Sequence, residues 1–227
     1  MDGLGQTVAV QQTVTGQAWE IVVAAGGGTR FGAAKQCARL GAVSVLDRAV
    51  GVARASCDGV VVVLPAEHDW SAPADVLTAT GGATRSASVR AGLALVPDDV
   101  DVVVVHDAAR PFASRALFAR VVAAVRAGAD AAVPGIPVMD TVKRVRDHVV
   151  VETVARDDLV AVQTPQAFRR AALERAHATD GVGTDDAALV EAAGGTVVVV
   201  EGEARNFKIT LVADLELAQT MIEEARA

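Results

Sequence analysis

The chain contains 227 residues, of which 52% are hydrophobic and 22% are charged, so it is not a disordered, collagen-like or coiled-coil protein. Its formal net charge of −7 argues against a general nucleic-acid surface, because such surfaces collect positive charge. The longest apolar runs have only a few residues, whereas a transmembrane helix needs about 20, so we predict neither nucleic-acid binding nor a membrane-spanning segment.

The polar beginning of the chain, rich in Gly, Gln and Thr, predicts a poorly ordered leader over residues 1–19, followed by a single domain over residues 20–227. In that domain, short β-branched runs alternate with helical stretches. Near-continuous apolar runs are typical of strands buried on both faces of a mostly parallel sheet, so the alternation predicts an α/β, doubly wound fold. The predicted strands are Ile21–Ala25, Val60–Leu64, Val102–Val105, Ala131–Pro134 and Val197–Val200.

Two of the helical stretches have a clear apolar face. Ser114 is a candidate N-cap for the first of them, because a hydroxyl there accepts from a free backbone N–H. A second amphipathic helix closes the chain. The apolar positions are Leu117, Phe118, Val121, Val122 and Val125 in the first helix, and Leu211, Leu215, Ala218 and Ile222 in the second.

The segment over residues 140–166 interrupts the alternation. Two β-prone runs, Thr141–Val145 and Val149–Val154, flank a polar turn, which predicts a protruding β-hairpin. An isolated hairpin is marginal in water, so this one needs something to pack on. Two arrangements would supply it: exchange of the hairpin as an arm with another subunit, or packing on its own domain.

The first predicted strand leads into a glycine-rich turn that contains three consecutive glycines, with Arg30 and Lys35 close behind. Consecutive glycines let the backbone turn tightly and bring N–H groups to a phosphate, while the two cations add charge. The spacing fits neither the dinucleotide-binding fingerprint nor a Walker A loop. It predicts a phosphate-binding loop, and the alternative is an ordinary strand-to-helix turn.

A second glycine-rich turn, at Gly81-Gly82, precedes a helix start that is rich in hydroxyls. Its backbone N–H groups and Ser88 are placed to bind an anion or the edge of a base. The alternative is that Thr84 or Ser86 only caps the helix.

The strand at Val102–Val105 runs directly into His106 and Asp107. This places a carboxylate at the carboxyl edge of the sheet, where open α/β sheets bind their ligands, and such an oxygen ligand suits Mg²⁺. The alternative is that Asp107 caps a helix and pairs with Arg110.

Lys208 lies between two apolar residues near the end of the chain, so in a strand it would point away from them and could reach the site. The alternative is a solvated lysine. The histidines have no metal-binding spacing, and we expect all of them to be structural or solvent-facing; they are His68, His106, His148 and His177.

Together these motifs resemble the 2-C-methyl-D-erythritol 4-phosphate cytidylyltransferase family over nearly the whole chain from Ile21 onward. The resemblance rests on seven motifs in order: A-A-G-G-G-T-R, G-G-A-T-R-S-A-S-V, V-H-D-A-A-R-P, D-T-V-K-R, Q-T-P-Q-A-F, T-D-D-A and N-F-K-I-T. One departure is a shortened segment between Arg30 and Lys35, with Ala34 where the family has proline and Cys37 where it has an aromatic residue. We therefore expect this loop to be locally rebuilt.

The resemblance implies a Rossmann-like nucleotidyltransferase that transfers a cytidylyl group from CTP to 2-C-methyl-D-erythritol 4-phosphate, in non-mevalonate isoprenoid precursor synthesis. Alternatives are a ribitol-5-phosphate cytidylyltransferase and a non-catalytic nucleotide-binding protein of the same fold. By resemblance, Arg30, Lys35 and Lys208 are catalytic, and Asp107 also holds Mg²⁺. CTP is bound by Ala24, Ala25, Gly26, Gly27, Gly28, Gly82 and Ser88, and the remaining substrate contacts are Asp107, Arg110, Thr141 and Arg156.

The resemblance also implies a homodimer, in which an arm over about residues 140–160 carries Arg156 into the site of the partner. Cys37 and Cys57 have no metal-ligand spacing and no context that argues for a disulfide, which predicts the reducing cytoplasm.

Overall fold

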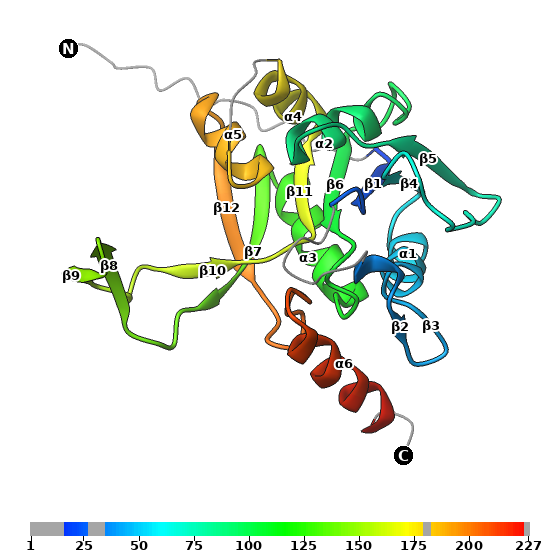
Figure 1. Ribbon diagram of the computed structural model, residues 1–227. Coiled ribbons are helices and arrows are strands. Elements are labelled where there is room, and N and C mark those ends of the chain that lie inside the picture. Colours follow the sequence, from blue (N-terminus) through cyan, green and yellow to red (C-terminus); the bar gives the residue numbers. More distant parts are fainter. Residues whose placement is uncertain (1–15, 27–34, 179–182, 225–227) are drawn as a thin grey trace, which may run out of the picture.

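A central sheet runs through the middle of the molecule (Figure 1). The computed structural model describes residues 16–26, 35–178 and 183–224. The strands of the sheet follow the order β10–β7–β11–β6–β1–β4–β5, and β12 pairs with β7. Their bounds are β1 Ala18–Val23, β4 Gly59–Leu64, β5 Val76–Thr80, β6 Val102–Asp107, β7 Ala131–Pro137, β10 Val160–Val162, β11 Gln166–Arg169 and β12 Val197–Glu201.

The half of the sheet from β6 to β5 is parallel, and so is the pair β7–β12. The chain winds outward from β1 in both directions, so the topological switch point lies between β1 and β6. The mostly parallel, doubly wound α/β fold expected from the sequence is thereby confirmed. The sequence did not predict β5, or β11, which is antiparallel to both of its neighbours β6 and β7.

Two strands differ from their predicted bounds in a way that matters for the site. β1 begins at Ala18, so its first two residues belong to the predicted leader, and it ends at Val23. Ala24 and Ala25 therefore lie in the turn and not in the strand. β6 continues to Asp107, two residues beyond its predicted end, and brings that carboxylate to the carboxyl edge of the sheet.

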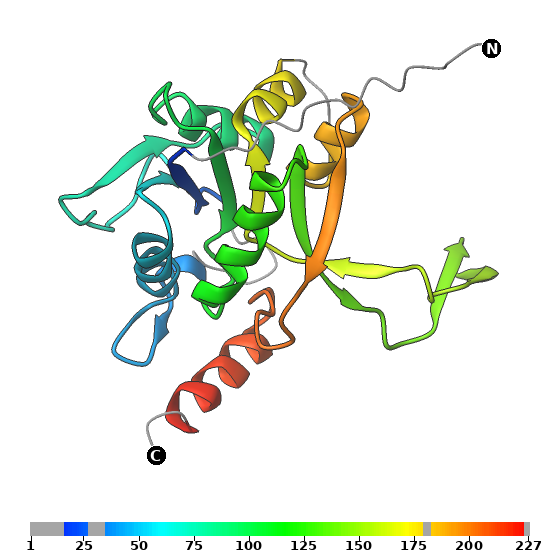
Figure 2. The same ribbon diagram turned by 180° about the vertical axis from the view of Figure 1, so that it is seen from behind.

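Helices cover both faces of the sheet (Figures 1 and 2). The alternation of side chains along β1 shows why, since Ile21 packs with α2, α4 and α5 while Val22 packs with α1. α3 packs beside α1 on the same face of the sheet, over β6, β7 and β11. The helices are α1 Val45–Ser56, α2 Arg85–Leu93, α3 Arg115–Arg126, α4 Arg170–His177 and α5 Asp186–Ala192.

The two amphipathic helices predicted from the sequence are both present. In α3, the Leu117 backbone donates to the Ser114 hydroxyl over 3.1 Å, and all five predicted apolar residues are buried. The closing helix α6 spans Val212–Glu224 and packs on Leu40 and Ile209. Leu211 was wrongly placed on its apolar face: it precedes the helix and is 53% exposed.

Short elements connect the first strand to α1. They are η1 Lys35–Cys37, β2 Arg39–Leu40 and β3 Val43–Ser44. Ser44 and Asp47 form a reciprocal capping box at the start of α1. No helix within the described ranges is long and apolar enough to cross a membrane.

The predicted hairpin is present as β8 Val142–Arg146 and β9 Val149–Val154, and both views show it extending away from the sheet (Figures 1 and 2). Asp147 and His148 form its turn with φ values of 47° and 65°, the left-handed conformation that a two-residue hairpin turn requires. We call residues 140–160 the arm. Four of its valines are half exposed or more: Val145, Val149, Val150 and Val151.

Candidate active site

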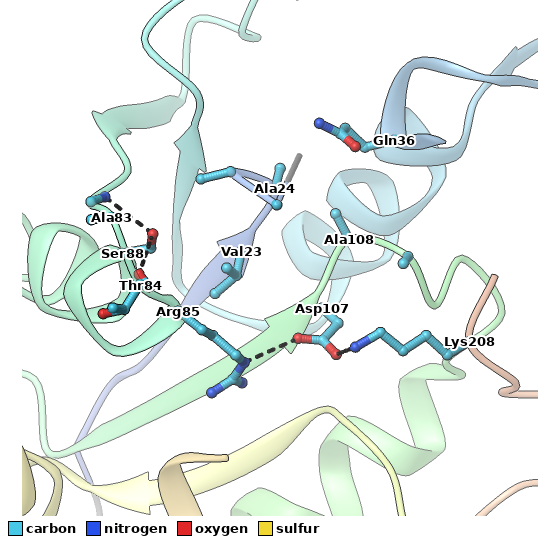
Figure 3. A pocket seen from close by; sticks show the side chains of 14 residues that line it. Val23, Ala24, Gln36, Ala83, Thr84, Arg85, Ser88, Asp107, Ala108 and Lys208 are labelled. Atoms are coloured by element: carbon cyan, nitrogen blue, oxygen red, sulfur yellow. Dashed lines mark hydrogen bonds and ion pairs between the residues drawn. The ribbon is translucent and has the colours of Figure 1, made fainter. Parts of the chain in front are cut away.

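A pocket lies at the switch point of the sheet, between the carboxyl ends of β1 and β6 and the start of α2 (Figure 3). The turn after β1 and the two residues after β6 form its floor, and Lys208 reaches it from the segment before α6. This is where open α/β sheets bind ligands. The lining residues are Val23, Ala24, Ala25, Gly26, Gln36, Gly82, Ala83, Thr84, Arg85, Ser88, Asp107, Ala108, Ala109 and Lys208.

The turn before α2 brings backbone N–H groups to the pocket wall. Thr84 is the N-cap of α2, as one of the sequence-based alternatives held, and its hydroxyl accepts from Ala87 N over 3.0 Å. Ser88 has a different role, because its Oγ accepts from Gly82 N over 3.2 Å and donates to the Thr84 carbonyl. This bond fixes the glycine turn against the first turn of the helix.

Gly81 is required by close packing of this turn against the loop after β1. A Cβ built on Gly81 would lie 2.3 Å from the Ala25 Cβ and 3.0 Å from the Ser88 Oγ. The Gly81 N–H also donates to the Leu64 carbonyl over 2.7 Å, which ties the turn to the end of β4. The second glycine-rich turn therefore lies against Ala25, the residue that leads into the first one.

Asp107 is held between two cations. Lys208 Nζ donates to Asp107 Oδ2 over 2.6 Å, and Arg85 Nε lies 3.5 Å from Asp107 Oδ1. Burial alone would raise the pKa of the Asp107 carboxyl, but Lys208 and Arg85 outweigh it and lower this pKa to about 2. Asp107 is therefore a fixed negative charge at neutral pH, with a different partner on each oxygen.

Hydrogen bonds to three backbone carbonyls hold the segment that carries Lys208. Ile209 N donates to the Ala109 carbonyl over 2.9 Å, and Asn206 Nδ2 donates to the Thr164 carbonyl over 2.8 Å. Arg110 Nη1 donates to the Asn206 carbonyl over 2.8 Å. Arg110 thus supports the Lys208 segment from outside the pocket lining. Asp107 ends β6 and forms ion pairs with Lys208 and Arg85, so the alternative in which it caps a helix is wrong.

A buried hydroxyl and imidazole position the end of β6. Asp107 N donates to Thr164 Oγ1 over 3.0 Å, and the same oxygen lies 2.9 Å from His106 Nδ1. His106 Nε2 lies 3.1 Å from the Arg110 carbonyl. Burial lowers the pKa of His106 to about 4, so at neutral pH the ring is uncharged, with Nδ1 accepting and Nε2 donating. His106 is structural, as expected.

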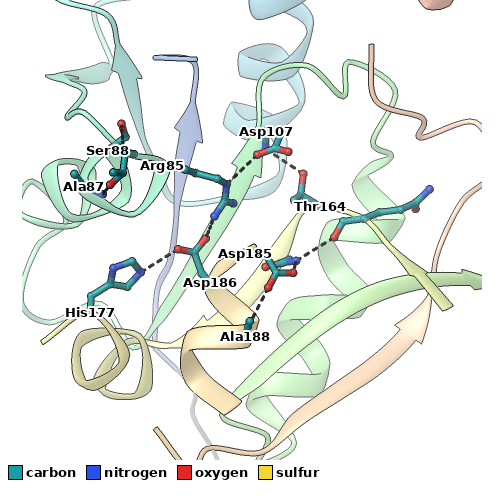
Figure 4. A network of polar contacts seen from close by, with 12 residues as sticks. Arg85, Ala87, Ser88, Asp107, Thr164, His177, Asp185, Asp186 and Ala188 are labelled. Carbon is teal, nitrogen blue, oxygen red and sulfur yellow. Dashed lines mark hydrogen bonds and ion pairs between the residues drawn. The ribbon is translucent and has the colours of Figure 1, made fainter. Parts of the chain in front are cut away.

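A second carboxylate stands behind Arg85 (Figure 4). Asp186 Oδ2 accepts from Arg85 Nη1 over 2.5 Å, and Asp186 Oδ1 lies 2.9 Å from His177 Nε2. Its neighbour Asp185 serves other partners, because it caps α5 by accepting from Ala188 N and also accepts from Gln166 Nε2. Polar contacts therefore run continuously from Lys208 through Asp107 and Arg85 to Asp186.

The pocket contains many of the residues singled out in the sequence. Gly27, Gly28 and Arg30 lie outside the described residues, and Lys35 begins η1, next to the pocket residue Gln36. The predicted residues that line the pocket are Ala24, Ala25, Gly26, Gly82, Ser88, Asp107 and Lys208.

Thr141 and Arg156 are not brought to this pocket within the chain. Both are exposed and lie in the arm, which extends away from the sheet (Figure 2). Arg156 Nη1 donates to the Met139 carbonyl at the base of the arm.

Sequence reasoning missed Arg85, Thr164 and Asp186, although each lies within a motif that carried the resemblance. The signal for Arg85 was its position in the first turn of a helix beside the second glycine turn. No signal pointed to the Arg85–Asp186 contact, which joins residues 101 positions apart.

The donors present fit a magnesium ion that shares its coordination with a phosphate ligand. Within the described part of the chain, no group of three or more His, Cys, Asp or Glu could hold a metal ion. Asp107 supplies one ionised carboxylate at the pocket. Mg²⁺ is commonly bound through one or two carboxylates, with water and substrate phosphates in its other positions.

Comparison with known sequences identifies similar proteins along nearly the whole chain. A sequence model of the 2-C-methyl-D-erythritol 4-phosphate cytidylyltransferase family matches residues 19–224. The protein of that name from Rhodococcus jostii (strain RHA1) is 44% identical over 233 residues, which cover 98% of this chain and 98% of that protein. The bifunctional enzyme IspD/IspF of Clavibacter michiganensis subsp. michiganensis (strain NCPPB 382) is 47% identical over 219 residues, but this chain spans only 53% of its length.

Solved structures show the same fold. The crystal structure of 2-C-methyl-D-erythritol 4-phosphate cytidylyltransferase from Thermus thermophilus matches with a TM-score of 0.78 and 38% sequence identity, covering 89% of this chain and 98% of that one. A 4-diphosphocytidyl-2C-methyl-D-erythritolsynthase from Anaerococcus prevotii DSM 20548 matches with a TM-score of 0.79 and 27% identity, covering 92% of this chain and 96% of that one.

Proposed function

Since the chain belongs to the 2-C-methyl-D-erythritol 4-phosphate cytidylyltransferase family, it transfers a cytidylyl group from CTP to 2-C-methyl-D-erythritol 4-phosphate, and we propose that the pocket between β1 and β6 is the site of transfer. The products are the CDP-linked polyol, an isoprenoid precursor, and pyrophosphate. The observation that carries the proposal is the meeting of Asp107, Lys208, Gly26 and Gly82 at the switch point of the sheet.

The two glycine turns divide the nucleotide between them in this proposal. The loop after β1 wraps the triphosphate with backbone N–H groups, because glycines leave room for close approach. The turn before α2 binds the cytosine through Gly82 and Ser88, whose mutual hydrogen bond orients both groups. The loop residues are Ala24, Ala25, Gly26, Gly27 and Gly28.

Charge neutralisation is the main catalytic device that we propose for this site. A phosphate monoester has its second pKa near 6, so the attacking phosphate is already largely dianionic and needs no general base. Arg30, Lys35 and Lys208 balance the negative charge that collects as the α-phosphorus of CTP is attacked in line. Lys208 leaves Asp107 for the phosphate in this step, and its flexible stem permits that move.

Mg²⁺ fits beside Asp107 together with the triphosphate of CTP. When bound there, the ion neutralises the phosphates and the leaving pyrophosphate. Before substrate arrives, Asp107 is already ionised, because Lys208 and Arg85 lower the pKa of its carboxyl to about 2. The same carboxylate would then hold the ion in place of Lys208.

The polyol side of the site is completed by a second copy of the chain in our proposal. The domain that contains the pocket contributes Arg110, and the partner contributes Thr141 and Arg156 on its arm. The exposed valines of the arm support this assembly, because a two-stranded hairpin needs an apolar surface to pack on.

The free thiols of Cys37 and Cys57 suit a reducing cytoplasm.

The test is pyrophosphate release with CTP and a panel of polyol phosphates. We expect 2-C-methyl-D-erythritol 4-phosphate to give the highest kcat/KM and ribitol 5-phosphate a much lower one. Replacing CTP by another nucleoside triphosphate should also lower kcat/KM strongly. Reactions that lack the polyol phosphate control for simple hydrolysis of CTP. A preference for ribitol 5-phosphate would overturn the assignment of the acceptor.

A further inference from the structure

We propose that Asp186 is a positioning residue that holds Arg85 against Asp107, and thereby fixes the direction of the Asp107 carboxylate in the pocket. Asp186 does not line the pocket, so it acts through Arg85 and not on the substrate. The inference rests on the proposed role of Asp107 in binding CTP and Mg²⁺.

Asp186 is buried, and each of its carboxylate oxygens has a partner. Its side chain is 0% exposed, and a buried carboxylate is costly unless it is paired. Arg85 Nη1 binds one oxygen over 2.5 Å, and His177 Nε2 approaches the other over 2.9 Å. With both oxygens engaged from opposite sides, the carboxylate has one orientation and presents a fixed anchor to Arg85.

The planar guanidinium of Arg85 transmits the position of Asp186 to Asp107. Its guanidinium faces two carboxylates at once, with Nη1 on Asp186 and Nε at 3.5 Å from Asp107 Oδ1 (Figure 4). Burial disfavours its charge, but Asp186 and Asp107 together raise the pKa of Arg85 above its ordinary value. A planar guanidinium held at one end has a fixed direction at the other, which a lysine ammonium cannot reproduce.

The need for this anchor arises when substrate binds. Lys208 holds Asp107 Oδ2 over 2.6 Å, but the proposed reaction moves Lys208 to a phosphate. Arg85 then keeps its ion pair with Asp107 while the pair with Lys208 is broken. Because Asp186 keeps Arg85 in place, the Asp107 carboxylate keeps its direction while its other partner leaves.

The test is Asp186→Asn, which preserves the size of the side chain and removes its charge. We expect kcat/KM for CTP to fall at least about tenfold, with more Mg²⁺ needed for half-maximal activity and KM for the polyol phosphate unchanged within about twofold. Calorimetric binding of CTP in the presence of Mg²⁺ should weaken to a similar extent. A purely structural role would instead lower the melting temperature and leave these constants unchanged.

The matched control is Asp185→Asn at the adjacent position. Asp185 caps α5 and accepts from Gln166, and among the described residues no hydrogen bond or ion pair joins it to Arg85, on which its charge acts only through space. Asparagine is also a good N-cap. This variant should therefore change the CTP constants and the magnesium dependence by less than about twofold, far less than Asp186→Asn does.

A double-mutant cycle with Arg85→Lys tests the route of the effect. Arg85→Lys should reproduce the loss, and adding Asp186→Asn to it should change kcat/KM by less than about twofold, because the shared contact is already broken. Independent, multiplicative effects would overturn the inference. So would a folded Asp186→Asn enzyme with wild-type CTP binding. If Asp186→Asn does not fold, wild-type constants in the Arg85→Lys enzyme overturn the inference instead.

Asp107→Asn separates this inference from the function on which it rests. An unchanged magnesium titration in Asp107→Asn would remove the proposed role of Asp107 itself. A weakened titration in Asp107→Asn together with a normal one in Asp186→Asn would remove only the anchoring role of Asp186.

Discussion

The Lys208 ammonium donates to the Asp107 carboxylate over 2.6 Å, and so joins the segment before α6 to the carboxyl end of β6. Each residue is the other's partner before substrate arrives, although our proposal gives them different ligands during the reaction. The ion pair keeps two opposite charges balanced at the pocket wall. CTP and Mg²⁺ would replace it by bringing a phosphate to the lysine and a cation to the carboxylate.

Lys208→Ala should lower kcat at least about 100-fold, because a charge beside the developing pentacoordinate phosphorus acts mainly in the transition state. The free energy of unfolding should change little, since Arg85 stays beside Asp107 when the lysine is removed. Single-turnover kinetics and thermal unfolding of the same preparation measure both effects. A folded variant with normal turnover would remove Lys208 from the mechanism.

Local patterns were sufficient for most of the fold. Apolar β-branched runs predicted β1, β4, β6 and β7 because these strands are largely buried in the sheet. The same kind of run predicted β12, although that strand is only half-buried. The Ser114 hydroxyl predicted the start of α3. The glycine-rich motifs predicted the place of the pocket, and at Gly81 a side chain would collide with the Ala25 Cβ.

The features that the sequence did not predict depend mainly on contacts between distant residues. β11 is only four residues long, Gln166–Arg169, and its place between β6 and β7 comes from tertiary pairing and not from a hydrophobic pattern. Arg85 and Asp186 lie 101 positions apart, so their contact leaves no trace in local spacing. Leu211 fitted a helical period but lies just before the first turn of α6, where its side chain is exposed.

Gly81→Ala should raise KM for CTP about tenfold and destabilise the protein by about 1–3 kcal/mol, because the new methyl group would lie 2.3 Å from the Ala25 Cβ. Relief of this clash must move the Gly81 turn away from Ala25. Initial-rate kinetics and urea unfolding measure the two effects.

Gly51→Ala is the matched control for that substitution. Gly51 lies inside α1, and a Cβ there would meet nothing within 4 Å. Alanine should raise stability by about 0.5–1 kcal/mol through helix propensity and leave the kinetics unchanged. Equal effects of the two substitutions on KM would contradict the packing role of Gly81.

The stability of the protein should depend on pH through His106. Its pKa is lowered to about 4 by burial, whereas the unfolded chain has a histidine pKa near 6.5, so between these values only the unfolded state binds the proton. The contribution is fully present above about pH 6.5 and is lost as the pH falls toward 4. As the pH is lowered through this range, the unfolding free energy of the wild type should therefore fall more steeply than that of His106→Gln, by about 1.4 kcal/mol per pH unit.

Chemical denaturation at several pH values between 4 and 7 measures that slope. His148→Gln is the control, because His148 is exposed at the turn of the arm and its loss should keep the wild-type slope. Parallel curves for wild type and His106→Gln would show that the buried imidazole is not the source of the acid sensitivity.

Arg156→Ala should raise KM for the polyol phosphate while leaving CTP binding nearly intact, because Arg156 lies on the arm and away from the pocket of its own chain. If the arm completes the site of a partner, each active site combines residues of two chains. Closed two-fold symmetry is the commonest way to satisfy such reciprocal exchange. Steady-state kinetics with each substrate varied in turn separates the two constants.

Complementation then tests whether the site is shared. A heterodimer of Arg156→Ala and Lys208→Ala chains has one site with both residues intact and one site with neither, so co-expression of the two variants should recover part of the activity that each homodimer lacks. Differently tagged chains allow the heterodimer to be purified and its composition verified. A control dimer of two differently tagged Lys208→Ala chains has no intact site and should stay inactive. An active monomer, or a verified mixed dimer without recovered activity, would return Arg156 to its own subunit.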